Sequence, residues 1–262
     1  MAGPDGAGAH LVNDAHRQQS SGLRMDWGPA GAAAVAQDTD VVVVVDVLSF
    51  TTTVTVAVER GIEVFPCRWN DARAASYAAE EDAVLAVGRR VARRTGSGVS
   101  LSPSSVLAAT GVERLVLPSP NGSTISLGLA EAGSSVVAAS LRNATAVARW
   151  LAADARVAVV AAGERWPDGS LRPAAEDLWG AGAVLAALSD RGRTDLSPEA
   201  RLAEQAFRAV ADRLPVELRV CASGCELVDS GFEADVEVAA DLDASDAVPV
   251  LVDGSFTWRA GS

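Results

Sequence analysis

The chain has 262 residues, 49% hydrophobic and 21% charged, a balance typical of a globular protein with a sizeable core. Its net charge of −12 argues against a nucleic-acid-binding surface and against a basic membrane-binding patch, because both need a cationic face. All 22 basic residues are arginine, so no lysine is present to form a Schiff base or to serve a phosphate-binding loop.

Cysteine usage and hydropathy indicate the compartment. Three cysteines (Cys67, Cys221 and Cys225) are too few for the disulfide framework of a secreted protein. Cys221 and Cys225 also lack the spacing and the histidine companions of a metal site. No stretch approaches the ~20 apolar residues of a membrane span, and the N-terminus has no signal-peptide core. We therefore expect a cytoplasmic protein.

Residues 1–22 are rich in Gly, Ser, Gln and Asp, a composition that cannot bury enough apolar surface to offset its ordering entropy. We predict a disordered tail there and a single domain over residues 23–262. Both histidines, His10 and His16, lie in the predicted tail. Ser-His-Asp and Cys-His mechanisms are therefore excluded for the domain.

From residue 40 onward the pattern alternates between strands and helices. Such alternation predicts a three-layer α/β/α fold with a mainly parallel sheet. In chain order we expect a strand at 41–45, a helix at 51–60, a strand at 62–65, a helix at 71–86, a loop at 96–105, a strand at 115–118, a helix at 123–132, a strand at 136–139, a helix at 144–153, a strand at 157–162, helices at 173–188, from 197 and at 232–242, and a last strand at 248–252.

Four of these strands end in polar residues able to do chemistry. Asp46 follows the first, residues 119–123 follow the third, residues 140–143 the fourth, and Glu164 the fifth. In an open parallel sheet the carboxyl ends of the strands line the crevice in which ligands bind. We therefore predict one converging site.

Carboxylates dominate this set. Asp46 can hold Mg²⁺ or act as a general base, and equally can cap the helix that follows it. Glu176 and Asp177 precede Gly180 and Gly182, which permit close helix–sheet packing and can bring both carboxylates to the cleft; solvated surface acids are the alternative. With Glu164 they form an oxygen-rich set, which suits Mg²⁺ better than zinc.

Groups that could bind a phosphate accompany the carboxylates. Residues 120–123 combine a rigid turn, a permissive glycine and a helix start whose free N–H groups could hold an anion. Asn143 is also explained as a helix cap. The predicted substrate-binding residues are Ser119, Asn121, Gly122, Ser123, Arg142 and Asn143.

Taken together, these segments resemble the 2-phosphosulfolactate phosphatase (ComB) family. The resemblance is carried, in order, by DVLSFTTTV (46–54), SPNGS (119–123), RNATAVA (142–148), AAGE (161–164), EDLWGAGAV (176–184), SGCELVDSGFEADVEVAADLD (223–243) and VPVL (248–251). It implies an α/β/α fold and a Mg²⁺-dependent hydrolase that removes phosphate from 2-phospho-3-sulfolactate, a step toward coenzyme M.

The sequence departs from the family at charged positions. The family usually has an arginine where this chain has Ser49, which Phe50 follows, and another where it has Cys225. A glycine-glutamate-arginine segment of the family corresponds here to residues 88–90, without its glutamate. Arginine is suited to binding phosphate or sulfonate through paired hydrogen bonds. Arg89, Arg90 or Arg142 could offset the loss.

Two functions remain open. The first is a Mg²⁺-dependent phosphomonoester hydrolase in which Asp46, Glu164 and Glu176 are catalytic and the metal ligands are drawn from Asp46, Glu164, Glu176 and Asp177. The second is a catalytically lapsed relative that binds an anionic metabolite. A nucleotide-binding oxidoreductase is disfavoured because no GxGxxG follows a strand. The expected partner is a small phosphorylated metabolite, and a homodimer is left open.

Overall fold

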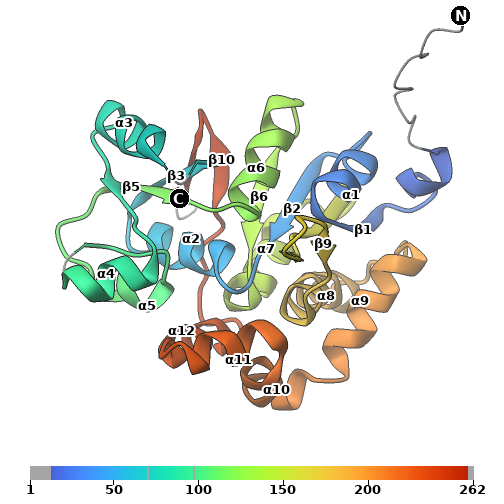
Figure 1. Cartoon of the computed structure of the whole chain (residues 1–262). Coiled ribbons are helices and arrows are strands. Elements are labelled where there is room, and N and C mark those ends of the chain that lie inside the picture. The colour runs from blue at the N-terminus through green and yellow to red at the C-terminus, as the bar shows by residue number, and fades with distance from the viewer. Residues whose placement is uncertain (1–12, 70, 97, 259–262) are drawn as a thin grey trace, which may run out of the picture.

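A computed structural model describes residues 13–69, 71–96 and 98–258 (Figure 1). The first twelve residues of the predicted tail lie outside this description. The rest of the predicted tail includes η1 (Asp14–Arg17), a turn of 3₁₀-helix. The Gln18 side chain after it donates to the carbonyl of Met25 at 2.8 Å and accepts from the N–H of Met25 at 3.2 Å. This segment therefore contacts the first strand of the domain.

The centre of the molecule is a nine-stranded sheet with the order β1-β7-β2-β6-β10-β11-β3-β5-β4. Neighbouring strands pair in parallel except around the β10–β11 hairpin, which is antiparallel to both of its neighbours. A separate antiparallel pair is formed by β8 and β9. The strands are β1 (Leu23–Trp27), β2 (Val41–Val45), β3 (Glu63–Cys67), β4 (Val84–Leu85), β5 (Arg114–Pro118), β6 (Val136–Ala139), β7 (Val157–Ala161), β8 (Glu164–Arg165), β9 (Leu171–Arg172), β10 (Val250–Val252) and β11 (Ser255–Thr257).

Helices surround the sheet (Figure 1). Among the described residues none of them is long and apolar enough to cross a membrane. They are α1 (Gly28–Val35), α2 (Phe50–Glu59), α3 (Ala72–Glu80), α4 (Arg89–Thr95), α5 (Pro103–Ala108), α6 (Gly122–Glu131), α7 (Ala144–Trp150), α8 (Ala175–Asp190), α9 (Pro198–Arg208), α10 (Leu214–Val220), α11 (Ala222–Asp229) and α12 (Glu233–Ala240), with 3₁₀ turns η2 (Leu141–Asn143) and η3 (Ala211–Arg213).

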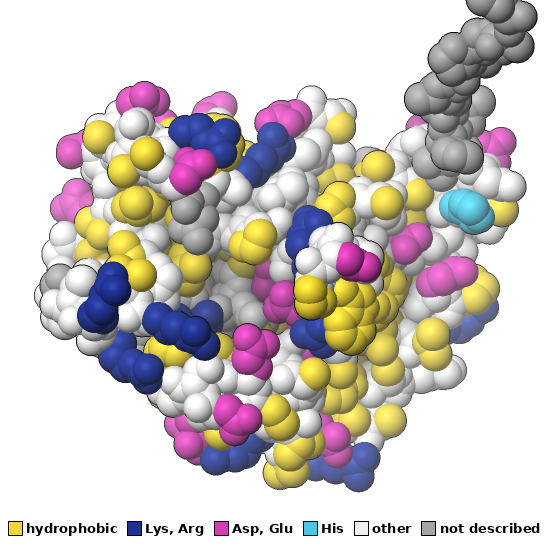
Figure 2. All heavy atoms as spheres, viewed as in Figure 1, with side chains coloured by type: hydrophobic (Ala, Val, Ile, Leu, Met, Phe, Trp, Pro, Cys, Tyr) yellow, Lys and Arg dark blue, Asp and Glu magenta, His cyan; other side chains and the backbone are white. Residues whose placement is uncertain are grey.

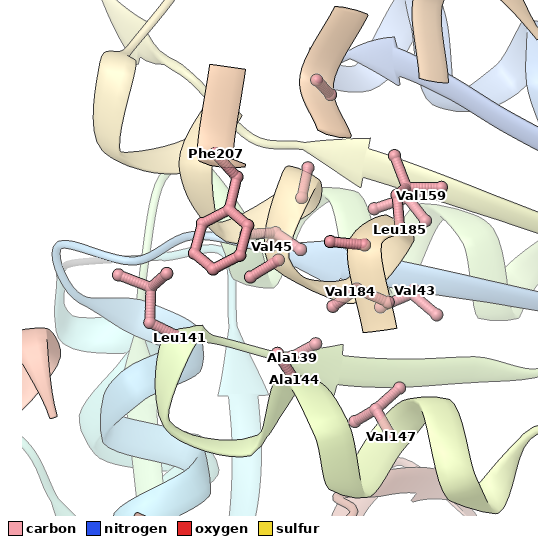
Figure 3. Close-up of a cluster of buried hydrophobic side chains, with 14 of the residues drawn as sticks. Val43, Val45, Ala139, Leu141, Ala144, Val147, Val159, Val184, Leu185 and Phe207 are labelled. Atoms are coloured by element: carbon pink, nitrogen blue, oxygen red, sulfur yellow. The ribbon is translucent and has the colours of Figure 1, made fainter. Parts of the chain in front are cut away.

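The all-valine strand β2 shows why the fold has three layers. Val43 and Val45 belong to one core, with side chains of α7, α8 and α9. Val42 and Val44 belong to another, with side chains of α1, α2 and α6. Figure 3 shows the first core, where Val43 and Val45 lie among Val184, Leu185 and Phe207. A strand buried on both faces needs apolar residues at every position, which explains the continuous run.

The predicted fold class, a three-layer α/β/α arrangement with a mainly parallel sheet, is confirmed. The helix predicted at 71–86 is wrong in its second half. α3 ends at Glu80, Asp82 takes a positive φ of 48°, and the edge strand β4 follows. The alanine-rich sequence keeps its helical spacing past Glu80. Residues 84 and 85 are nevertheless extended, because they pair with β5.

The sequence also failed to indicate β1, because Arg24 interrupts its apolar pattern. Arg24 is fully buried, and its guanidinium donates to the carbonyls of Ser21, Val35 and Gln37. Ser21 precedes the strand, Val35 is the last residue of α1, and Gln37 lies just after that helix. A charged residue in a buried strand is compatible with the fold when such partners exist.

Two glycines in α8 allow this helix to approach its neighbours closely. A Cβ atom at Gly180 would lie 2.6 Å from a methyl of Val47 and 2.7 Å from one of Val45. One at Gly182 would lie 2.1 Å from the carbonyl oxygen of Ala203 in α9. The expected close packing of α8 on the sheet is therefore present, and it places the first turn of α8 beside the end of β2.

Candidate active site

The segments after β2, β5 and β7 meet at a cavity of about 140 Å³. Asp46, Asn121 and Glu164 line it, as does Ser119. Arg89 lines it from the start of α4, and apolar side chains form much of the remaining wall: Leu48, Phe50, Leu101 and Leu117. Figure 2 shows a hollow in this face of the molecule, with acidic and arginine side chains around it. Three of the four predicted polar strand ends therefore converge.

A larger cavity of about 540 Å³ lies between α1 and α6, away from these groups. Its lining is mainly alanine, glycine and threonine, and Asp38 is its only titratable member among the described residues. Such a lining offers little for chemistry, so the smaller cavity with its carboxylates is the candidate site.

Asp46 lies between the N-termini of two helices. Its Oδ1 accepts from the N–H of Phe50 at 3.1 Å and its Oδ2 from the N–H of Gly122 at 2.9 Å. Burial raises the pKa of Asp46 to about 6, although these two backbone hydrogen bonds oppose the increase. Helix N-termini favour a negative charge at this point. Asp46 thus caps a helix, as one interpretation of the sequence proposed, and also faces the cavity.

Gly122 is required at the start of α6 for a steric reason. A Cβ atom at this residue would lie 2.1 Å from the ring of Phe50 and 2.8 Å from Oδ2 of Asp46. The sequence predicted that the free N–H groups at the helix start within residues 120–123 could hold an anion. In the structure the N–H of Gly122 binds the carboxylate of Asp46, an anion from the chain itself.

Glu164 begins β8 and lies beside Asn121. Nδ2 of Asn121 donates to Oε2 of Glu164 at 3.1 Å, while Nε of Arg165 donates to Oδ1 of Asn121 at 3.1 Å. Burial, together with the nearby charges of Asp46 and Glu176, raises the pKa of Glu164 to about 7. A carboxyl group with this pKa exchanges its proton near neutral pH.

Glu176 and Asp177 lie behind the cavity in the first turn of α8. Both are buried, with 2% and 3% of their surface exposed, so they are not solvated surface acids. Asp177 accepts from the N–H of Val47 at 2.7 Å and from that of Gly163 at 2.8 Å, and so connects the segments after β2 and β7. Burial and the charge of Asp46 raise the pKa of Asp177 well above its usual value.

The thiol of Cys221 lies next to Glu176, with Sγ 3.4 Å from Oε2. Burial and the charge of Glu176 raise the pKa of Cys221 to about 12. This thiol is therefore protonated at neutral pH and donates to the carboxylate. It behaves as a structural cysteine.

Three predicted substrate-binding side chains are engaged in the fold and do not line the cavity. Ser123 donates to the carbonyl of Leu117 at 3.0 Å. Arg142 donates to the carbonyl of Val238 at 2.9 Å and pairs with Asp241.

Asn143 is the third. It is the third residue of η2 in a capping box whose N-cap is Ser140, and it donates to the carbonyl of Ala247 at 2.9 Å. Asn143 occupies the N-cap position of α7 but makes no side-chain hydrogen bond to that helix, so the position in the helix-cap interpretation is confirmed and the capping contact is not. Cys225 lies on the exposed surface of α11, with its thiol near the carbonyl of Val220, and does not line the cavity. Its position therefore contributes no side chain to the candidate site.

Sequence reasoning missed Asp235, an acid that supports the cavity without lining it. It is 1% exposed on α12 and pairs with Arg89 at 2.7 Å. Its only signal in the sequence is an acid between Ala234 and Val236 on the buried side of a helix. Arg89, by contrast, reaches the cavity as one of the arginines expected to offset the missing charges.

The carboxylates fit a loosely held Mg²⁺. Asp46, Glu164, Glu176 and Asp177 form none of the ion pairs of the described residues, and mutual repulsion raises the pKa values of several of them. A cation in the cavity would relieve this repulsion. In residues 13–69, 71–96 and 98–258, however, no three His, Cys, Asp or Glu side chains form a ready-made metal group. Mg²⁺ is commonly held by one or two carboxylates and retains several waters.

Comparison with known proteins places this chain in a family. A family model for 2-phosphosulpholactate phosphatase matches residues 31–254. Two proteins named probable 2-phosphosulfolactate phosphatase, from Deinococcus radiodurans and Thermus thermophilus, are each 34% identical to this chain, over 220 and 233 residues respectively. These matches cover 82% and 87% of this chain and 89% and 94% of the relatives. A protein of the same name from Thermotoga maritima is 28% identical over 220 residues, a match that covers 83% of this chain and 91% of the relative. The chain therefore belongs to the 2-phosphosulfolactate phosphatase family, a family of phosphoric monoester hydrolases.

Proposed function

We propose that this protein is a Mg²⁺-dependent phosphomonoester hydrolase and that 2-phosphosulfolactate, the compound in the names of its relatives, is the first substrate to test. The observation that carries the proposal is the meeting of Asp46 and Glu164 with Asn121 and Arg89 in one cavity. Carboxylates that bind a cation, beside donors that bind an oxyanion, are the groups that metal-assisted hydrolysis of a phosphomonoester uses.

Asp46 and Glu164 would hold Mg²⁺, which polarises phosphoryl oxygens and lowers the pKa of a bound water when present. Asp177 keeps the segments that carry these two residues together through its two backbone hydrogen bonds. Nδ2 of Asn121 donates one hydrogen to Glu164, and its second hydrogen would donate to a phosphoryl oxygen. Phe50 and Leu117 contribute apolar surface to the cavity lining, and the exclusion of water there would strengthen these interactions.

Phosphate release from 2-phosphosulfolactate and from a panel of sulfonate-free phosphomonoesters tests the proposal, with Mg²⁺ and with excess EDTA. We expect turnover that depends on Mg²⁺. Glu164→Gln should lower kcat/KM by at least about 100-fold, since even residues that only orient a metal ligand commonly contribute 10- to 100-fold. Asp212→Asn, at an exposed acid in η3, is the matched control and should leave kcat/KM unchanged.

Equal activity of wild type in EDTA, or full activity of Glu164→Gln, would contradict the assignment. The alternative function, a lapsed relative that only binds an anionic metabolite, predicts a different result. Phosphate or a phosphomonoester would then bind to the protein, and no compound in the panel would be turned over.

A further inference from the structure

Arg89 enters the candidate site from an element that carries none of the predicted catalytic residues. It is the first residue of α4 and lines the cavity that Asp46 and Glu164 also line. Its Nη2 donates to Oγ of Ser49, at the start of α2. It is the cationic member of the lining among the described residues.

The guanidinium of Arg89 is fixed by a buried carboxylate. Its Nε donates to Oδ2 of Asp235 at 2.7 Å. The other oxygen of Asp235 accepts from the hydroxyl groups of Ser102 and Ser104 and from the N–H of Ser104. The ring of Phe232 also lies 5.8 Å from the guanidinium carbon of Arg89. A side chain held on several sides loses little entropy when it binds a ligand.

One nitrogen of this guanidinium remains available. Nε and Nη2 are engaged, whereas in the described part of the chain no protein acceptor contacts Nη1. The Arg89 side chain is 18% exposed, at the wall of the cavity. Arginine presents its donors in a planar fork that matches the spacing of oxyanion oxygens, so a fixed guanidinium beside a cavity is suited to binding one.

We propose that Arg89 binds an oxyanion of the substrate in this cavity and that Asp235 positions it. The inference rests on the proposed function, because it names the group that recognises the substrate in the same site. The residue that recognises the substrate then lies on α4. The positive charge next to Ser49 accordingly comes from α4 and not from α2. The oxyanion is either the phosphoryl group or a second anionic group of the substrate.

Binding of inorganic phosphate, measured by isothermal titration calorimetry in the presence of Mg²⁺, tests the inference without turnover. Arg89→Gln should raise the Kd at least about 30-fold, the usual size of a lost charge contact in a desolvated site. Arg94→Gln is the matched control, because Arg94 is exposed on the same helix and does not line the cavity. Its Kd should stay within threefold of wild type. A Kd for Arg89→Gln within threefold of wild type would show that Arg89 does not bind the phosphoryl group; together with an unchanged KM for 2-phosphosulfolactate, it would overturn the inference.

Two substrates distinguish which oxyanion is bound. If Arg89 binds the phosphoryl group, Arg89→Gln raises KM equally for p-nitrophenyl phosphate and for 2-phosphosulfolactate. If it binds a second anionic group, KM rises for 2-phosphosulfolactate alone. Unchanged KM for both substrates would contradict the inference even if the enzyme is active. The wild-type protein could bind phosphate without turning over any substrate. Loss of phosphate binding in Arg89→Gln would then support the role of Arg89 and reject the proposed hydrolase activity.

Arg89→Gln leaves the buried carboxylate of Asp235 unpaired and could unfold the protein. The double variant Arg89→Gln/Asp235→Asn removes both charges and keeps groups that can form hydrogen bonds. It should melt near wild type and still lose phosphate binding at least about 30-fold. Wild-type phosphate affinity in this folded double variant, together with an unchanged KM for 2-phosphosulfolactate, would show that the pair is only structural. Asp235→Asn alone keeps the positive charge of Arg89 but removes the carboxylate that positions it. It should therefore raise the Kd for phosphate by less than Arg89→Gln does.

Discussion

Asp46 and Asp177 are buried carboxylates of the same cluster, yet their contacts give them different tasks. Asp46 lines the cavity and accepts one backbone N–H on each oxygen, which leaves lone pairs free for a cation. Asp177 accepts from two loops and does not line the cavity. Asp177 is one of the four acids predicted as metal ligands. Its contacts indicate that it positions the segments that carry Asp46 and Glu164.

Asp177→Asn tests this positioning role. An amide keeps one acceptor and places an N–H₂ group against the second backbone N–H, so one buried donor loses its partner. We expect the free energy of unfolding in urea to fall by about 1–3 kcal/mol. Asp212→Asn, at an exposed acid, should change it by less than about 0.5 kcal/mol. Equal stability of the two variants would show that the Asp177 contacts contribute nothing.

At the scale of the elements, α8 connects the core to the candidate site. Its N-terminal turn carries Glu176 and Asp177, and its middle packs on the sheet and on α9 through Gly180 and Gly182. The position of the two carboxylates therefore depends on how closely the rest of the helix can approach its neighbours.

Gly182→Ala and Gly128→Ala form a matched pair of helix substitutions. Alanine is about 1 kcal/mol more favourable than glycine in a helix interior. In α6 the new methyl at Gly128 would have its nearest neighbour at 3.9 Å, so Gly128→Ala should raise the free energy of unfolding by up to about 1 kcal/mol. In α8 the methyl at Gly182 would meet the Ala203 carbonyl at 2.1 Å, and Gly182→Ala should lower it by about 1–3 kcal/mol.

Urea denaturation of both variants measures the difference. If Gly182→Ala is as stable as Gly128→Ala, the distance between α8 and α9 is not limited by this contact. A loss of activity without a loss of stability in Gly182→Ala would instead show that a shift of α8 reaches the candidate site.

At the scale of the molecule, the acid cluster makes stability depend on pH in an unusual direction. Burial raises the pKa of Asp46 from 3.8 to about 6 and that of Glu164 from 4.5 to about 7. Between pH 4 and pH 7 the folded protein therefore binds protons that the unfolded chain has released. The free energy of unfolding should fall as the pH rises through this range, because these carboxylates must become charged in a buried site.

Calorimetric melting at pH 5.5 and pH 8 checks this expectation. In EDTA the Tm should be lower at pH 8 than at pH 5.5. MgCl₂ should raise the Tm more at pH 8, because a cation binds ionised carboxylates and competes with protons at lower pH. The double variant Asp46→Asn/Glu164→Gln should lose most of both effects. A wild-type Tm in EDTA that rises from pH 5.5 to pH 8 would contradict the assignment of these pKa values.

The sequence by itself determined the fold class and part of the site. The valine run of β2 predicted a strand buried on both faces, and the polar residues after β2, β5, β6 and β7 were predicted to meet. Both conclusions depend on local properties, since strand burial follows from the apolar pattern and parallel strands present their carboxyl ends at one edge. Asp46, Asn121 and Glu164 do line one cavity.

Only the tertiary structure decided which polar residues face that cavity. Asn143 and Arg142 follow a strand as Asp46 does, but their partners Ala247 and Val238 lie about a hundred residues away and draw them into the fold. Arg89 reaches the site because Asp235, 146 residues away, holds its guanidinium. A hydrogen-bonding side chain takes the acceptor that packing places beside it, and packing depends on segments that are remote in the sequence.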